Sequence, residues 1–227
     1  MPLYKFIEKE FLEGFFNNGT LRLGTIYDFK DIVEHGVSRG DHSEGEHRLI
    51  RGIDDILRIT KDKHEPILSE VFKVEGEGEI LLSYLNITVP RRCEDGFLFC
   101  TSSIYTEQLY RRWHKENGVD ACYEIINPQG FIMAISRAIS NSAYFYENSN
   151  VTYTEENIDY QSPHANIHPA FTKVKNDYDW QVENRSVWGV RGPCGPLRPW
   201  VISVPEAIQF CRPFAGLENG KITYTGV

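Results

Sequence analysis

The chain has 227 residues, which suits one large domain, and 41% of them are hydrophobic, which excludes a mainly disordered protein. Its net charge of −8 argues against a protein that coats nucleic acid through electrostatics alone. The pairs Arg91-Arg92 and Arg111-Arg112 are the sequence features that would supply a local basic groove.

The sequence gives little support for a metal site, for disulfide bonds or for a membrane segment. The chain has five cysteines without paired spacing, which is typical of reduced thiols. His164 and His168 lack a second pair of ligands nearby, so we expect no metal site. No stretch approaches the ~18 apolar residues of a membrane helix, and residues 1–11 lack the apolar core of a secretory signal. We expect a cytoplasmic protein without membrane contact, folded as one domain over residues 1–227.

The first third of the chain predicts a strand over residues 3–7, a helix over 8–16 and a strand over 20–26. The helix follows from apolar residues spaced by three and four positions, and it is expected to end at Asn17-Asn18-Gly19. Residues 28–48 are polar and aperiodic, so a long loop is expected there. Strands interrupted near 61–63 are expected over 57–74, with a hairpin turn over 74–79.

The rest of the chain predicts more strands than helices. A helix is expected over residues 107–117, ended by Gly118, and a short terminal helix from Pro205, preceded by residues 201–204. Further strands are expected over residues 97–103, 121–126, 130–135 and about 181–188. The predicted class is α+β and rich in strands.

The most informative residues are three polar side chains within the last of these segments. On a strand, Gln181, Glu183 and Arg185 share one face, while Val182 and Asn184 take the other. Such a face is either a solvated outer surface or part of a site.

The Gln-x-Glu spacing at residues 181 and 183 resembles the signature of ADP-ribosyltransferases, in which the glutamate is catalytic. Thr101-Ser102-Ser103 resembles the Ser-Thr-Ser strand of that superfamily, with the first two residue types exchanged. The order of an early basic strand, a hydroxyl strand and a glutamate strand also matches. More closely, the chain resembles a group of bacterial toxin-like members that share a Leu-Tyr-Lys start, a Gly-Thr-Leu-Arg strand and a loop of the type Asp41–Gly45.

The resemblance implies an ADP-ribosyltransferase-like split β-sheet core with flanking helices, and NAD as substrate. Cleavage of NAD passes through an oxocarbenium-like transition state, for which Glu183 is the expected catalytic carboxylate. Gln181 is expected to orient the acceptor. The residues expected to hold NAD, by hydroxyl contacts, pyrophosphate binding or stacking on nicotinamide, are Tyr4, Lys5, Arg22, Tyr27, Thr101, Ser102 and Ser103, with Tyr110 as a second stacking choice.

Several alternatives stay open. A NAD glycohydrolase would use the same residues with water as acceptor, and a catalytically inactive module would keep the fold only to bind a nucleotide or partner. A nuclease would need a metal constellation, for which residues 28–47 offer only a dispersed acidic loop. The resemblance implies a toxin of a toxin–antitoxin or phage-defence system, with an antitoxin as partner. The acceptor is RNA, DNA or protein; basic pairs and exposed aromatics favour nucleic acid, whereas the acidic charge opposes it.

Overall fold

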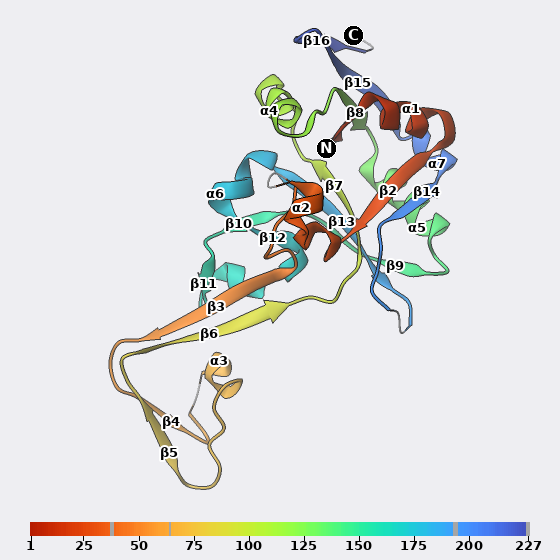
Figure 1. Ribbon diagram of the computed structural model, residues 1–227. Coiled ribbons are helices and arrows are strands. Elements are labelled where there is room, and N and C mark those ends of the chain that lie inside the picture. The colour runs from red at the N-terminus through yellow and green to blue at the C-terminus, as the bar shows by residue number, and fades with distance from the viewer. Residues whose placement is uncertain (37–38, 64, 193–194, 226–227) are drawn as a thin grey trace.

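The computed structural model of the chain describes residues 1–36, 39–63, 65–192 and 195–225 (Figure 1). Its largest unit is a nine-stranded sheet, accompanied by three small sheets of two or three strands. The chain is therefore a mixed structure made mostly of strands, which confirms the predicted α+β class in its general form. No helix within the described ranges is long and apolar enough to cross a membrane.

The chain opens, as predicted, with strand β1 (Leu3–Ile7), helix α1 (Lys9–Asn18) and strand β2 (Thr20–Thr25). The helix ends at Gly19, whose φ of 68° is left-handed and whose N–H donates to the Phe15 carbonyl at 2.7 Å. A Cβ atom at this position would lie 2.4 Å from the backbone of Val204, so only glycine fits.

The large sheet is built around strand β7. Seven of its strands follow one another in the order β14 (Trp200–Ser203), β2, β7 (Phe97–Ser102), β1, β8 (Ala121–Ile125), β15 (Cys211–Glu218) and β16 (Lys221–Tyr224). The other two are β13 (Glu183–Val190), which pairs with β7, and β9 (Ala143–Asn150), which pairs with β13.

This arrangement splits the sheet along one edge of β7. On one side β7 pairs with β13 over its whole length, from Phe97 opposite Trp188 to Ser102 opposite Glu183. On the other side its first two residues pair with β2, and only Ser102 pairs with β1, opposite Tyr4. Strands β1 and β2 therefore separate beside residues 99–101, and this gap positions the site described below.

The main apolar core lies on the face of the sheet that carries Phe99 and Trp188. Helices α1, α5 (Pro128–Ala138) and α7 (Pro205–Ile208) cover this face. The prediction of a strand over residues 130–135 is wrong, because these residues lie inside α5. The Asn127 side chain accepts the Gly130 N–H at 3.0 Å and caps the helix. Helix α7 is not terminal, since the β15–β16 hairpin follows it.

Residues 46–92 form an arm that extends from the body of the molecule (Figure 1). Its elements are β3 (Glu46–Ile53), β4 (Leu57–Thr60), α3 (Pro66–Ser69), β5 (Glu79–Leu82) and β6 (Leu85–Arg92). The prediction for residues 57–74 is partly wrong, because α3 follows β4, and residues 74–79 lead into β5 without joining two strands. The arm has its own apolar cluster around Leu49 and Leu68. That the chain is one domain stays a prediction.

The elements outside the large sheet, its covering helices and the arm are mostly short. The expected loop at residues 28–48 contains η1 (Asp28–Lys30) and α2 (Ile32–His35), and its end belongs to β3. Helix α4 (Glu107–Asn117) is confirmed, with Gly118 at a φ of 73° after it. The remaining elements are β10 (Thr152–Thr154), β11 (Asn157–Asp159), η2 (Pro163–Asn166), η3 (Pro169–Phe171), β12 (Thr172–Val174), α6 (Lys175–Tyr178) and η4 (Asp179–Gln181).

Candidate functional site

A cavity of about 420 Å³, here called the cleft, lies at the split in the sheet. Its walls come mainly from α1, β1, β2, β7 and the start of β13, with contributions from β12 and from the turn before β3. A volume of this size falls within the range of small-molecule sites, roughly 300–1,000 Å³. The cleft brings together residues that the sequence singled out from distant segments, namely Tyr4, Lys5, Arg22, Thr101, Ser102, Gln181 and Glu183.

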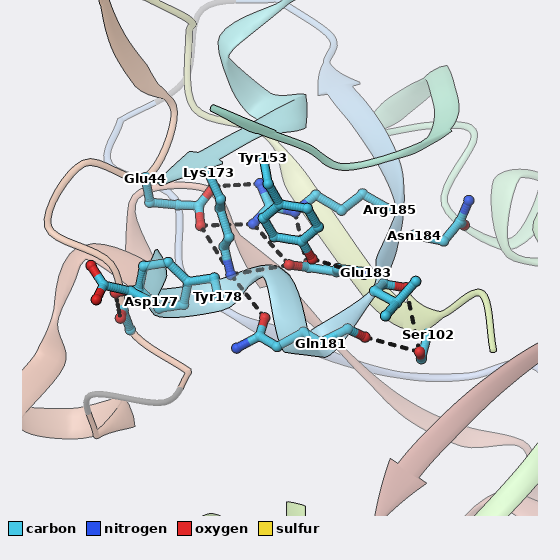
Figure 2. Close-up of polar contacts among 12 residues, drawn as sticks. Glu44, Ser102, Tyr153, Lys173, Asp177, Tyr178, Gln181, Glu183, Asn184 and Arg185 are labelled. Carbon is cyan, nitrogen blue, oxygen red and sulfur yellow. Dashed lines mark hydrogen bonds and ion pairs between the residues drawn. The ribbon is translucent and has the colours of Figure 1, made fainter. Parts of the chain in front are cut away.

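Four buried charged residues, here called the charge cluster, form one wall of the cleft: Glu44, Lys173, Glu183 and Arg185 (Figure 2). Arg185 Nε donates to Glu183 Oε1 at 2.8 Å, and its two terminal nitrogens bond the Glu44 carboxylate at 2.5 and 2.8 Å. Lys173 Nζ lies 3.0 Å from Glu183 Oε2. Two carboxylates thus face two cations, and the cluster is neutral as a whole.

Local structure explains how each member reaches the cluster. Glu183 and Arg185 lie two residues apart on β13 and so project from the same face. Lys173 comes from β12, while Glu44 comes from the turn before β3. Gly45 closes that turn with a φ of 70°, and a Cβ atom there would lie 2.6 Å from Ile26. Glycine at this position therefore lets the turn pack against the body and direct Glu44 inward.

The carboxylate of Glu183 is held in its ionised form. The residue is only 5% exposed, and burial alone would raise the pKa of its carboxyl. Arg185 and then Lys173 outweigh burial and hold the pKa well below its usual range. The backbone is fixed as well, because the Glu183 N–H donates to the Tyr153 hydroxyl at 2.9 Å. Glu183 therefore presents a fixed negative charge to the cleft.

The structure corrects the position of Gln181. It lies in η4, not on β13, and Val182, which separates Gln181 from Glu183, has a left-handed φ of 44°. The expectation that Gln181 and Glu183 share a strand face is therefore wrong. The two side chains still meet through Lys173, whose Nζ lies 3.3 Å from Gln181 Oε1 and 3.0 Å from Glu183 Oε2. Gln181 is 3% exposed and buried beside the charge cluster.

The hydroxyl strand supports the turn before Glu183. Ser102 Oγ donates to the Gln181 carbonyl at 2.9 Å, and Ser103 Oγ donates to the Val182 carbonyl at 3.1 Å. Thr101 Oγ1 donates to the Asn184 carbonyl at 3.2 Å. These bonds hold the backbone on both sides of Glu183. Ser103, unlike Thr101 and Ser102, does not line the cleft.

Two cations of the predicted early strands reach the cleft. Lys5 Nζ donates to the Cys100 carbonyl at 2.8 Å, inside the gap between β1 and β2, and lies 4.7 Å from the centre of the Phe99 ring. Burial lowers the pKa of Lys5. Arg22 lies nearer the solvent and is paired with Asp28 at 2.9 Å.

The three tyrosines proposed for NAD binding are placed differently. Tyr4 lines the cleft, but its hydroxyl donates to Glu124 at 3.3 Å and its ring packs on Tyr105. Tyr27 lies outside the cleft, and its hydroxyl donates to the Cys93 carbonyl at 2.7 Å. Tyr110 is fully buried in a separate apolar cluster. The expectation that Tyr27 or Tyr110 stacks on a ring in the cleft is therefore not met by this geometry.

Of the charge cluster, the sequence analysis assigns only Glu183 to the site, and it gives Arg185 a place on the same strand face without a role. Glu44 stood within the Asp41–Gly45 loop motif, and Lys173 stood near the Gln-x-Glu segment, but neither was assigned to the site. The usable signal was Arg185, a cation two residues after Glu183 on the same strand face. A buried arginine on a strand requires a carboxylate partner, and the loop motif offered one.

Neither comparison with known proteins nor the arrangement of metal-binding side chains assigns a further role to these residues. Searches against protein-family models, curated proteins and solved structures found no match to the chain. Among the residues that the structure describes, no group of three or more His, Cys, Asp or Glu side chains is arranged to hold a metal ion. Cys93, Cys100, Cys122 and Cys211 are free thiols, and Cys194 lies outside the described residues.

Proposed function

We propose that the cleft binds NAD and that the protein cleaves the bond between nicotinamide and ribose and transfers ADP-ribose to a macromolecular acceptor. The observation that carries this proposal is the convergence of Glu183, the hydroxyl strand and Lys5 on one cavity at the split of the sheet. A split β-sheet core of the ADP-ribosyltransferase type, a cytoplasmic location and a toxin role in growth control or phage defence belong to the same proposal.

The chemistry assigns a task to each group. Departure of nicotinamide leaves positive charge on the ribose, and a carboxylate held ionised in a poorly solvated site stabilises that charge. Glu183 supplies this carboxylate. Lys5 and Arg22 supply positive charge for the pyrophosphate, and the apolar rings of Phe15, Phe99 and Tyr123 line the same cavity. With water as acceptor, the same site would act as a NAD glycohydrolase.

One observation favours a second candidate, an inactive module that binds a nucleotide without cleaving it. Both oxygens of the Glu183 carboxylate already face cations, Oε1 facing Arg185 and Oε2 facing Lys173. A carboxylate whose charge is already balanced by two cations stabilises the positive charge that develops on the ribose less than an unpaired carboxylate does. Binding of NAD without release of nicotinamide would identify this second function.

The test uses NAD labelled in its adenylate half, with nicotinamide release and acceptor labelling measured in one reaction. Wild type is expected to release nicotinamide and label a macromolecule, and Glu183→Gln is expected to lower both by at least about a hundredfold. Glu65→Gln is the matched control, because it neutralises another arginine-paired carboxylate, which bonds Arg51 at 2.8 Å on the arm and does not line the cleft. Equal turnover by wild type and Glu183→Gln, with both folded, would refute the assignment.

A further inference from the structure

A second groove, of about 1240 Å³, lies at the end of β13 opposite to Glu183. It is lined by Val187 to Val190 of β13, by the segment around Tyr27 and by Tyr144 and Tyr146 of β9. It is about three times the volume of the cleft and exceeds the usual upper range for a small-molecule site, roughly 1,000 Å³. Its size therefore suits several residues of an extended chain.

Three tyrosines present their rings to this groove. Tyr27, Tyr144 and Tyr146 are 42–45% exposed, which is unusual for three aromatic residues on one surface. Strand β9 lies at the margin of the sheet, where it pairs only with β13 among the described strands (Figure 1). Opposite Tyr144 on β13 stands Gly189, where a Cβ atom would lie 2.4 Å from Cζ of the tyrosine. Glycine at this position is what allows the Tyr144 ring to lie across β13.

Among the described residues, most of the charged side chains that line the groove are carboxylates. Of the residues that the structure describes, four carboxylates line it, from Asp28, Asp31, Glu94 and Asp95, together with two guanidinium groups, from Arg92 and Arg198. Two of these groups are paired with residues outside the groove, Arg92 with Glu46 at 3.2 Å and Asp28 with Arg22 at 2.9 Å. Neither Glu94 nor Asp95 has an ion-pair partner among the residues of the described ranges. Asp95 is also held in place, because its Oδ1 accepts the N–H groups of Tyr27 and Gly96.

His168, the histidine that lines the groove among the described residues, does not offset this charge. His168 packs against Tyr146, with ring centres 4.9 Å apart. Burial lowers the pKa of His168, so the ring is neutral at pH 7.

We propose that this groove is a second binding site, which takes a basic segment of a partner protein, with arginine or lysine side chains lying against Tyr144 and Tyr146. Aromatic faces beside carboxylates recognise guanidinium and ammonium groups through cation–π attraction and ion pairing. Two rings of the groove already contact cations of the chain itself, since Lys30 Nζ lies 4.5 Å from the centre of the Tyr27 ring and Arg191 Cζ lies 5.8 Å from the centre of the Tyr144 ring. The net charge of −8 attracts a basic partner over longer distances and repels a nucleic acid. The groove does not depend on NAD chemistry in the cleft.

The test is calorimetric titration of the whole protein, at low salt, with a six-residue arginine peptide capped at both ends. The peptide is expected to bind wild type. Glu94→Gln is expected to weaken binding about fivefold, and Tyr146→Ala about tenfold, while Tyr146→Phe keeps the aromatic face and retains binding. Glu75→Gln, on the arm, is the matched control because it removes the same charge from an exposed carboxylate outside the groove.

Several results would overturn the proposal. The first is a lack of binding by wild type, or equal affinity of Glu94→Gln and Glu75→Gln. The second is stronger binding of a six-nucleotide thymidine oligomer, weakened by Tyr146→Ala, which would make the groove a nucleic-acid site. The third is binding of spermidine as tight as that of the peptide, which would make it a site for a small polyamine. Unfolding temperatures of all variants, measured alongside, separate loss of binding from loss of fold.

Discussion

Glu44 and Arg185 are separated by 141 positions in the chain, yet they form a two-point ion pair at 2.5 and 2.8 Å. Both side chains are 1% exposed. Arg185 also donates to the Ala170 carbonyl at 2.6 Å and to the Glu183 carboxylate. One guanidinium therefore ties the turn before β3, the η3 segment and β13 together.

Removing this guanidinium should destabilise the protein strongly. Arg185→Met leaves Glu44 and Glu183 with Lys173 as the remaining nearby cation of the cluster, so the free energy of unfolding should fall by about 3–5 kcal/mol. Denaturant unfolding followed by circular dichroism measures the change. Arg58→Met serves as control, because its ion pair with Glu79 is exposed and should contribute less than about 1 kcal/mol. Similar losses in the two variants would mean that the charge cluster does not hold the fold.

The ionised state of Glu183 should make part of the stability dependent on pH. Its folded-state pKa lies below the unfolded value, which is about 4.3 for glutamate. The contribution is therefore fully present above that pH and is lost as the pH falls towards the folded-state pKa. The difference in unfolding free energy between wild type and Glu183→Gln should be largest near pH 7 and should narrow below about pH 4. A difference that stays constant down to pH 3 would contradict the assigned ionisation.

Gln181 offers a test of how the cleft divides its tasks. Its amide oxygen holds Lys173, which in turn contacts Glu183. We therefore expect Gln181→Ala to lower nicotinamide release and ADP-ribose transfer together. Both products are measured from one reaction with NAD labelled in the adenylate half. Selective loss of transfer would instead assign Gln181 to the acceptor, as the sequence pattern alone suggests.

The proposed toxin role predicts an effect in living cells. Expression of the wild-type chain in a bacterium should arrest growth, and Glu183→Ala should restore it. Growth curves are compared at equal protein levels, which immunoblotting verifies. The control variant is Glu65→Ala, which loses a carboxylate paired with Arg51 outside the cleft. Unimpeded growth with wild type would argue against the toxin role.

The sequence predicted those helices and strands that are determined by residues close together in the chain. Helix α1 and its end at Gly19, helix α4 and its end at Gly118, and the strand that carries Glu183 all follow from periodicity and glycine positions. Helix α5 was missed because its short apolar run, Phe131 to Ile135, fits a strand as well as a buried helix. The cap at Asn127 and the proline after it were the signals that favour the helix.

The candidate site was predictable only in part. Glu183 and the hydroxyl strand were found because they stand in short motifs. Val182 has a left-handed backbone conformation, which a β-branched residue rarely adopts, so its residue type does not predict it. The displacement of Gln181 from the strand was therefore not predictable from the sequence. The pairing of Glu44 with Arg185 depends on how the turn before the arm packs against the sheet, which no local pattern specifies.

The order of strands in the large sheet also sets the order in which a newly made chain can complete the cleft. Strand β1 leaves the ribosome first but has to wait for β7 and β8, and β2 gains its outer neighbour only with residues 200–203. Glu183 itself arrives about eighty residues after the strand it pairs with, a delay on the order of ten seconds at bacterial rates of synthesis. Until then the gap beside β7 has no carboxylate from β13. A chain interrupted before β13 would therefore lack the proposed chemistry entirely, and the activity would appear only once four-fifths of the protein has been made.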